Sequence, residues 1–337
     1  MSEVVITGAA RTAMGGFQGV FADLPAAELG GAAIRAAHAE AGMPSVDELW
    51  MGCVLPAGQG QAPARQAGFA AGLGETVPAT TLNKMCGSGM KAVMAARDQI
   101  ALGQAVTVIA GGMESMTGAP YLLPRMRGGA RIGHDKVIDH MFLDGLEDAY
   151  DKGRLMGTFA EECAEAFQFT REAQDQYAIA SLDNALDAER SGAFANEITP
   201  VHIHARTGEE VITRDEQPGR ARPQKIPTLK PAFRKDGTVT AANSSSISDG
   251  AAALVLTTLD HAAATGATPR ARILGHASHA QAPHLFPTAP IPAAQALLDR
   301  IGWKKGDVDL WEVNEAFAVV TMASIRDLEL DPERVNK

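Results

Sequence analysis

The sequence is poor in cysteine, in aromatic residues and in long apolar runs, and each shortage excludes a class of protein. Its three cysteines, Cys53, Cys86 and Cys163, are too few for a disulfide framework and lack metal-ligand spacing. No apolar run is long enough to cross a membrane, and the chain enters a predicted strand at residue 3 without a signal-peptide pattern. We therefore expect a cytoplasmic protein of a reducing compartment, with no membrane segment and no bound metal.

Basic residues are also in the minority. The 30 Lys and Arg residues are outnumbered by 40 Asp and Glu residues, which gives a formal net charge of −10. Such an acidic protein is a poor partner for nucleic acid or for an anionic membrane. One basic, proline-rich stretch at 214–230 suits a multiply phosphorylated ligand, although a solvated loop is the commoner explanation for charges alone.

The residues that are present favour a globular protein with a large core. Hydrophobic residues make up 46% of the 337 residues, enough for two or three packed layers. Predicted strands alternate with predicted helices along the first part of the chain, which indicates an α/β fold with a largely parallel sheet. The strands are expected at 3–7, 49–55, 77–82 and 105–110, and the helices at 25–41, 62–72 and 91–103.

The segment 83–90 joins a predicted buried strand to a predicted helix and contains Cys86. Gly87 and Gly89 allow tight backbone geometry and the close approach of another group. A cysteine at the N-terminus of a helix has a lowered thiol pKa and can attack a carbonyl, and the free N–H groups can hold an oxyanion. Cys86 is therefore a candidate nucleophile, although most lone cysteines are small buried hydrophobic residues.

Two further segments follow predicted strands. The glycine-rich segment 111–116 comes directly after the strand at 105–110, and a serine-rich run at 244–248 follows residues 238–243. Ligands of α/β proteins bind beyond the carboxyl ends of strands. We therefore expect both segments to lie at the same cavity as Cys86.

The middle and the end of the chain indicate an insert and a repeat. From about 120 to 243 the alternating pattern is broken, apart from one strong helix at 170–191, and the pattern at 33–50 recurs at 293–311. The expected division is an N-terminal half at 1–119 plus 244–268, an inserted loop or lid domain at 120–243, and a partial C-terminal half at 269–337. That last half is unfinished by roughly 40 to 55 residues for a unit of ordinary size.

Five sequence blocks, in this order, closely resemble the thiolase family, specifically its acetyl-CoA C-acetyltransferases. The blocks are Asn83-Lys84-Met85-Cys86-Gly87-Ser88-Gly89, Gly111-Gly112-Met113-Glu114-Ser115-Met116, Met156-Gly157-Thr158-Phe159-Ala160-Glu161, Gly237-Thr238-Val239-Thr240-Ala241-Ala242-Asn243-Ser244-Ser245 and Asn314-Glu315-Ala316-Phe317. The resemblance covers the whole chain. It implies a five-layered α-β-α-β-α fold of two similar halves with a loop domain inserted in the first, assembled as a homodimer or homotetramer.

The resemblance also implies a reaction and a set of site residues. Cys86 takes an acyl group from acyl-CoA as a thioester and yields it to the carbanion of a second acetyl-CoA, which gives acetoacetyl-CoA and CoA; the reverse reaction is thiolysis. Asn314 orients a water in an oxyanion hole. Ser245 lies beside the pantetheine arm of CoA, Met156 lines its channel, and Arg220 is the candidate for the adenine or phosphate end. CoA thioesters are the substrates, and no metal or redox cofactor is implied.

The sequence departs from the family pattern at two points. Leu155 replaces a histidine that many members carry, which concerns a local contact and not the chemistry. Two C-terminal motifs are absent: a Gly-His-Pro motif whose histidine activates the nucleophile, and a Cys-x-Gly-Gly-Gly motif whose cysteine is the acid/base. None of the nine histidines precedes proline, and Cys53 and Cys163 lie in other blocks. We therefore expect either a truncated form or a chain without turnover of its own.

Three alternatives stay open. One is a degradative thiolase for longer 3-oxoacyl-CoA chains, and a second is an inactive fragment that binds CoA or a partner subunit. The third is a cysteine hydrolase, which needs a histidine partner for Cys86.

Overall fold

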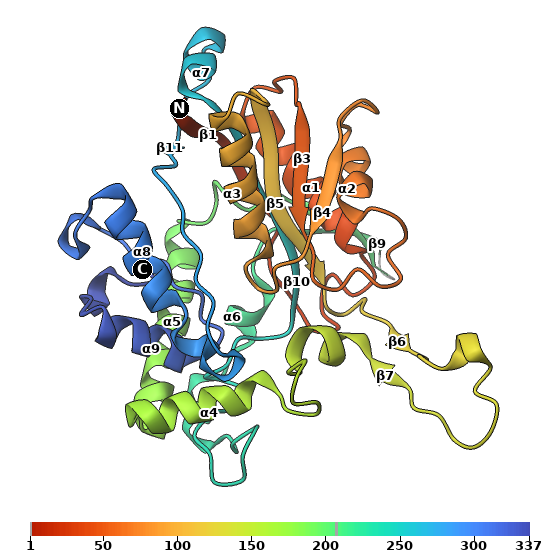
Figure 1. The fold of residues 1–337 in the computed structure, drawn as a ribbon, viewed down its shortest axis with the longest axis vertical. Coiled ribbons are helices and arrows are strands. Elements are labelled where there is room, and N and C mark those ends of the chain that lie inside the picture. The colour runs from red at the N-terminus through yellow and green to blue at the C-terminus, as the bar shows by residue number, and fades with distance from the viewer. Residues whose placement is uncertain (1, 206–207) are drawn as a thin grey trace. The chain divides into compact units, whose positions relative to one another are not determined.

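The computed structural model describes residues 2–205 and 208–337, and the chain divides into two compact units. Unit 1 comprises 1–145, 193–217 and 247–273, and unit 2 comprises 146–192, 218–246 and 274–337. The strands, labelled in Figure 1, are β1 Val4–Arg11, β2 Gly15–Gly16, β3 Glu48–Gly52, β4 Ala79–Leu82, β5 Thr107–Ser115, β6 Tyr121–Leu122, β7 Ile138–Asp139, β8 Val201–Ala205, β9 Gly208–Ile212, β10 Ser248–Thr258 and β11 Ala271–Arg272. The α-helices are α1 Ala26–Glu40, α2 Pro63–Ala71, α3 Ser88–Ala101, α4 Met156–Phe167, α5 Arg171–Ser191, α6 Glu216–Arg220, α7 Leu259–Thr265, α8 Pro290–Ile301 and α9 Ala318–Asp327.

Unit 1 is built on a mixed sheet in the order β11-β1-β10-β5-β3-β4 (Figure 1). β5 and β4 pair in parallel with β3, whereas β10 pairs antiparallel with both β1 and β5. The strands β1, β3, β4 and β5 therefore run in one direction, as the alternating pattern predicts. The prediction of a largely parallel sheet is nevertheless wrong, because a strand from 248–258 lies in the opposite direction between β1 and β5.

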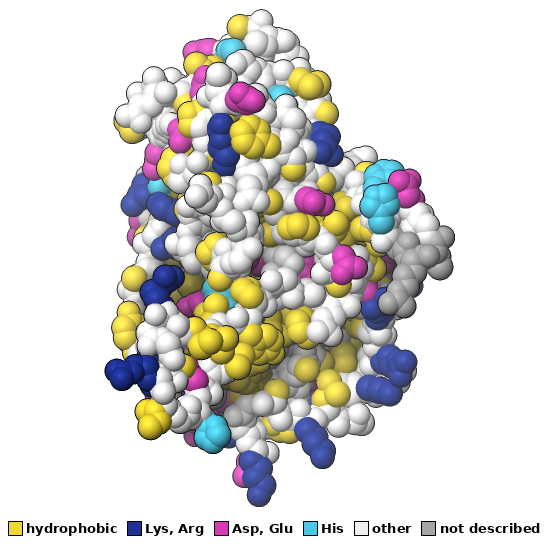
Figure 2. Space-filling model, turned by 90° about the vertical axis from the view of Figure 1, so that its right-hand side faces the viewer, with side chains coloured by type: hydrophobic (Ala, Val, Ile, Leu, Met, Phe, Trp, Pro, Cys, Tyr) yellow, Lys and Arg dark blue, Asp and Glu magenta, His cyan; other side chains and the backbone are white. Residues whose placement is uncertain are grey.

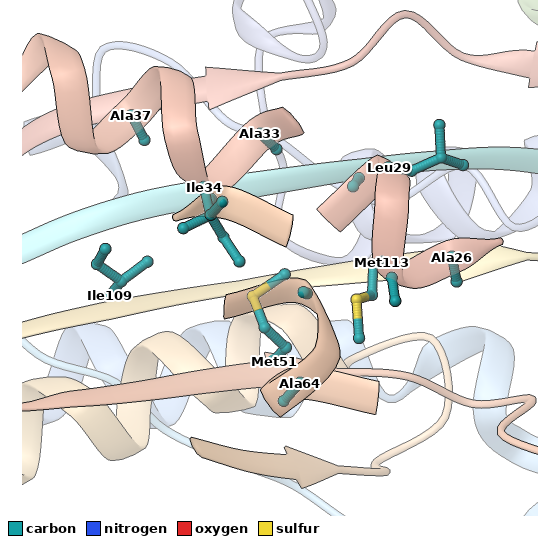
Figure 3. Packing of buried hydrophobic residues seen from close by; sticks show 14 of the residues in the cluster. Ala26, Leu29, Ala33, Ile34, Ala37, Met51, Ala64, Ile109 and Met113 are labelled. Carbon is teal, nitrogen blue, oxygen red and sulfur yellow. The ribbon is translucent and has the colours of Figure 1, made fainter. Parts of the chain in front are cut away.

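Helices cover both faces of this sheet, so that unit 1 has three layers. Successive residues of a strand point to opposite faces. In β5, Ile109 joins the cluster under α1 and α2, while Val108 and Ala110 join the cluster under α3. Figure 3 shows Ile34 of α1 beside Met51 of β3 and Ile109 in the first cluster. The second cluster fixes α3, and with it the chain that enters α3, on the sheet.

Unit 2 is mainly helical and has its own core, in which α4 and α9 pack with Val239 and Phe317. The helix predicted at 170–191 is confirmed as α5: the Thr170 hydroxyl accepts the Ala173 N–H at 3.2 Å, and Gly192 ends it in the left-handed region.

Of the predicted second copy of the repeat, the helix is present as α8 and the strands are not formed. If the second copy matches the first, it opens on a strand at 272–276; the structure has only β11 there, which pairs antiparallel with β1 in unit 1. The extended segment before Trp311 forms one isolated bridge, to Val335. Within the described residues of unit 2 there is no β-strand, and so no sheet of the kind that a second copy requires.

The insert expected at 120–243 contributes segments to both compact units, and the three-part division stays a prediction.

On the face shown in Figure 2, Lys and Arg side chains lie singly or in small groups among Asp and Glu side chains. Among the described residues, no helix has both the length and the hydropathy that a membrane crossing requires.

Candidate active site

Cys86 lies in the tight turn between β4 and α3, two residues before the first residue of the helix. The turn is closed by backbone hydrogen bonds from Gly87 N–H to Lys84 O at 3.1 Å and from Ser88 N–H to Met85 O at 2.9 Å. β4 is only four residues long and ends at Leu82, so the turn emerges at the carboxyl end of a parallel strand. The predicted strand–turn–helix geometry around Cys86 is confirmed.

The glycines that this turn needs are not the ones that the sequence indicates. Gly87 has an ordinary φ of −88°, and the left-handed position is Met85, with φ of +50°. A Cβ at Gly52 of β3 would lie 2.5 Å from the Ser88 carbonyl carbon, and a Cβ at Gly112 would lie 3.2 Å from Gly89 Cα. Gly52 and Gly112 therefore let the start of α3 rest directly on β3 and β5. The segment 111–116 is largely part of β5 rather than a loop after it.

Cys86 is the exposed cysteine of the three, since Cys53 and Cys163 are buried. Neighbouring protein atoms still remove part of the water around its sulfur, and this desolvation raises the pKa of the Cys86 thiol. A backbone hydrogen bond at Cys86 lowers that pKa and the charge of Glu114 raises it further, but the net direction is upward. The net pKa of the Cys86 thiol is therefore raised, contrary to the prediction from its place at a helix N-terminus. The thiol needs a base.

Glu114, near the end of β5, organises the segment that lies beside the turn. Its Oε2 accepts the Val54 N–H at 2.7 Å and its Oε1 accepts the Leu55 N–H at 3.1 Å and the Cys53 thiol at 3.5 Å. Burial raises the pKa of Glu114, and the two backbone N–H groups oppose that shift. Sequence reasoning missed this role, although a carboxylate inside a glycine-rich block is its visible signal.

His140 is the buried histidine of this region, and both of its ring nitrogens have partners. Nδ1 lies 2.6 Å from Asp144 Oδ2, and the Ala57 N–H donates to Nε2 at 3.4 Å. Nε2 therefore accepts and Nδ1 carries the proton that is shared with Asp144. His140 is thus engaged elsewhere and does not supply the Cys86 partner that the hydrolase alternative requires.

In unit 2 the structure brings Asn314 and Ser245 onto neighbouring segments. The Ser245 N–H donates to Ala316 O at 3.0 Å, and the Ala318 N–H donates to Asn243 O at 2.9 Å. The two predicted blocks therefore lie antiparallel and side by side, with the side chains of Asn314 and Ser245 exposed. These two predicted site residues are close in the fold although 69 positions separate 245 and 314 in sequence.

The neighbours of Asn314 are fixed by residues that sequence reasoning missed. The Glu315 carboxylate accepts the Tyr177 hydroxyl and the Ser181 hydroxyl of α5, each at 2.6 Å. The Asn336 side chain donates to Val313 O and accepts the Val313 N–H, both at 2.8 Å. Burial and the Glu315 carboxylate raise the pKa of Tyr177, so its phenol stays protonated and donates. The Val313 backbone and the Glu315 side chain, on either side of Asn314, are therefore held in place.

Glu161, which closes the third sequence block, supports the segment that leads to Ser245. Its carboxylate is 1% exposed and accepts the Thr238 N–H at 2.8 Å and the Val239 N–H at 2.9 Å. A buried carboxylate is tolerated when backbone N–H groups satisfy it.

The other two predicted site residues also belong to unit 2. Met156 begins α4, is half-buried and packs against the core that contains Phe317. Arg220 ends α6 and is exposed. Cys86 belongs to unit 1, and Asn314, Ser245, Met156 and Arg220 belong to unit 2. Among the described residues, no group of three His, Cys, Asp or Glu side chains is arranged to hold a metal ion.

Comparisons with known proteins decide the family. The "Thiolase, N-terminal domain" family matches residues 4–260, and the "Thiolase, C-terminal domain" family matches residues 267–337. The chain belongs to the thiolase family. The resemblance drawn from the five blocks is therefore confirmed, and so is the mixed α/β thiolase fold.

Curated proteins and solved structures of this family match along all or nearly all of this chain. Acetyl-CoA acetyltransferase B, mitochondrial, of Xenopus laevis is 48% identical over 340 residues, which cover 100% of this chain and 80% of that protein. The acetyl-CoA acetyltransferase of Pseudomonas aeruginosa is 46% identical over 340 residues, which cover 100% of this chain and 86% of that protein. The crystal structure of the Bacillus anthracis acetyl-CoA acetyltransferase superposes with a TM-score of 0.96 at 39% identity, covering 100% of this chain and 86% of that chain. Acat5 thiolase from Ascaris suum, in complex with coenzyme A, gives 0.94 at 38% identity, covering 99% and 86%.

Proposed function

We propose that this chain is an acetyl-CoA C-acetyltransferase, which forms acetoacetyl-CoA and CoA from two molecules of acetyl-CoA and also catalyses the reverse thiolysis. The acetyltransferases of Xenopus laevis and Pseudomonas aeruginosa support this substrate, since they are 48% and 46% identical to this chain over its whole length. The observation that carries the proposal is the exposed Cys86 in a strand–turn–helix elbow, at the carboxyl end of β4.

The first half-reaction moves an acetyl group onto Cys86. The thiol sulfur attacks the thioester carbonyl of acetyl-CoA, a new carbon–sulfur bond forms, and the bond to the CoA sulfur breaks. The proton of Cys86 ends on the departing CoA thiol, which balances the step. Because the pKa of Cys86 is raised, a base must take the proton as the sulfur attacks.

The second half-reaction needs a different acid/base group. A base removes a proton from the α-carbon of the second acetyl-CoA, and the carbanion forms a carbon–carbon bond to the acetyl–Cys86 carbonyl. The bond from that carbonyl to the Cys86 sulfur breaks, and the proton passes to the sulfur, which restores the thiol. Burial raises the pKa of Cys53 to about 12 and that of Cys163 to about 11, so neither suits this proton transfer near neutral pH. We assign Asn314 to the oxyanion hole for the acetyl-CoA oxygen.

The remaining site residues are proposed for CoA itself. Ser245 and Met156 contact the pantetheine arm, and Arg220 contacts the phosphate or adenine end. The reaction uses no metal or redox cofactor, because a thiol and a thioester exchange the acyl group directly. Assembly as a homodimer or homotetramer remains part of the proposal. The cytoplasmic location stays a prediction, since one relative named above is mitochondrial.

The test is the intact mass of the full chain before and after a brief exposure to acetyl-CoA. Acetylation of one thiol adds about 42 Da. We expect this gain in the wild-type chain and in a Cys163→Ala control, and its loss in Cys86→Ala. No gain in a folded wild-type chain would overturn the acyltransferase proposal in favour of an inactive CoA-binding fragment.

A further inference from the structure

The turn that presents Cys86 contains a residue in an unfavourable backbone conformation. Met85, directly before Cys86, has a φ of +50°. Residues other than glycine adopt this left-handed conformation rarely, and they keep it only when surrounding contacts impose it. The contacts that impose it here therefore also fix the direction in which the Cys86 side chain leaves the backbone.

The amide of Asn83 supplies the contact at the N-terminal side of Met85. Its Oδ1 accepts the Met85 N–H at 2.9 Å, and its Nδ2 donates to the Val54 carbonyl at 3.2 Å. Since a backbone N–H can only donate and a carbonyl can only accept, these two partners define which way round the amide lies. Asn83 thus joins the turn to the segment after β3.

Ser88 supplies the contact at the C-terminal side of Met85. Its hydroxyl donates to Met85 O at 2.6 Å and accepts the Lys84 N–H at 2.8 Å. The N–H and the C=O of Met85 are therefore both hydrogen-bonded by side chains. Ser88 thus holds the oxygen of the peptide bond between Met85 and Cys86. Asn83 holds the N–H of the peptide bond between Lys84 and Met85.

The far end of the Asn83 bridge is itself anchored. Val54 N–H donates to Glu114 Oε2 at 2.7 Å, so the carbonyl that Asn83 contacts belongs to a residue tied to β5. A continuous path of hydrogen bonds runs from Glu114 through Val54 and Asn83 to Met85. It connects the rigid sheet to the residue that precedes the nucleophile.

We propose that Asn83 is a positioning residue for acyl transfer: its amide links Val54 O to Met85 N–H and thereby aims the Cys86 thiol at the thioester carbonyl. This inference rests on the proposed function. An error of about 1 Å in the position of a reacting group can lower a rate by about a hundredfold.

Three variants of the full chain test the role. Asn83→Ala removes both hydrogen bonds. Asn83→Ser keeps an oxygen that can accept the N–H two residues on, as serine does in turns, but cannot reach Val54 in the same way. Asn196→Ala changes an exposed asparagine elsewhere in unit 1 and is the matched control. Each variant is measured for the rate of Cys86 acetylation by acetyl-CoA, for the pH midpoint of Cys86 alkylation by iodoacetamide, and for the thermal midpoint.

We expect Asn83→Ala to acetylate at least about tenfold more slowly and to shift its alkylation midpoint to higher pH, because the backbone hydrogen bond at Cys86 is lost when the turn relaxes. Asn83→Ser should recover part of both quantities, because it restores the bond to Met85 N–H and not the bond to Val54 O, and Asn196→Ala should match the wild type. Wild-type rate and midpoint in Asn83→Ala would overturn the proposal. So would an equal loss in the alanine and serine variants that follows their thermal midpoints, since that pattern describes a merely structural residue.

Failure of the proposed function gives a different result. If the folded wild type takes no acetyl group, acyl transfer itself is overturned. The alkylation midpoint then decides the role of Asn83: a shift in Asn83→Ala that serine reverses supports positioning of the thiol, and an unchanged midpoint contradicts it.

Discussion

The side chain of Asn336 brackets the backbone of Val313: its Nδ2 donates to Val313 O and its Oδ1 accepts the Val313 N–H, both at 2.8 Å. Asn336 also donates to Glu315 Oε1 at 2.8 Å and has a φ of +52°. One residue therefore holds the Val313 backbone and the Glu315 carboxylate, which lie on either side of Asn314.

Replacing Asn336 should destabilise unit 2 through two separable effects. Asn336→Gly removes the hydrogen bonds and keeps the left-handed backbone, so we expect a loss of about 2 kcal/mol in the free energy of unfolding. Asn336→Ala removes the same bonds and must also hold an alanine in the left-handed region, which asparagine tolerates better, so it should lose about 3 kcal/mol. Urea unfolding measures both. Equal values for the two variants would mean that backbone conformation contributes nothing at this position.

The Gly52→Ala substitution should displace the start of α3. The new Cβ would lie 2.5 Å from the Ser88 carbonyl carbon and 2.6 Å from Gly89 N. We expect a loss of about 1–3 kcal/mol in stability, as for other overpacked sites, and slower acetylation of Cys86. Gly128→Ala is the control, since a Cβ there meets no atom within 4 Å. A Gly52→Ala chain with wild-type stability and acetylation would contradict this packing.

Alkylation of the folded chain should be selective for one thiol. Cys86 is exposed, whereas Cys53 and Cys163 are buried with pKa values near 12 and 11. Iodoacetamide at pH 8 should add one carbamidomethyl group to the native chain, on Cys86, and three after unfolding. Peptide mapping by mass spectrometry identifies the site, and prompt labelling of Cys53 would show that the segment after β3 opens.

The rate of this alkylation should rise with pH to a midpoint above the ordinary value of about 8.5. The thiolate is the reactive form, and both desolvation and the Glu114 charge raise the pKa of Cys86. Removing that charge with Glu114→Gln should move the midpoint to lower pH, whereas Gln59→Ala leaves the charge in place and serves as the control. A midpoint that rises in Glu114→Gln would mean that loosening of the turn outweighs the lost charge.

Glu161→Gln should be costly for unit 2 despite its similar size. The buried carboxylate accepts two neighbouring backbone N–H groups, and an amide would turn an NH2 donor toward one of them. We expect about 2–3 kcal/mol of destabilisation by urea unfolding, since hydrogen bonds to a charged group are lost. The exposed Glu162→Gln is the matched control and should change stability by less than about 0.5 kcal/mol.

Local patterns predicted the elbow around Cys86 and the long helix α5, because strand ends, helix caps and small residues act over a few neighbouring positions. The sheet was predicted less well. Nothing between residues 3 and 110 reveals that β10 pairs with both β1 and β5. Its pairing is a property of distant segments, and a periodicity argument does not reach that far.

The site shows the same limit. Cys86, Asn314 and Ser245 are recognised by their blocks, but the side chains that hold them are not. Glu114 contacts Val54 across 60 positions, and Tyr177 contacts Glu315 across 138. Sequence spacing carries no signal for such pairs, and the residue that needed a left-handed backbone was a methionine rather than a glycine.

The central place of β10 has a consequence for how the chain folds during synthesis. β1 and β5 have no direct hydrogen bonds to each other, and the strand that joins them ends at Thr258. Until the ribosome has released about 260 residues, both strands present open edges that can pair with other chains. The sheet of unit 1 is therefore completed late, through contacts of high sequence separation that close slowly. Unfinished chains of this protein therefore expose the edges of β1 and β5 that β10 covers in the folded chain.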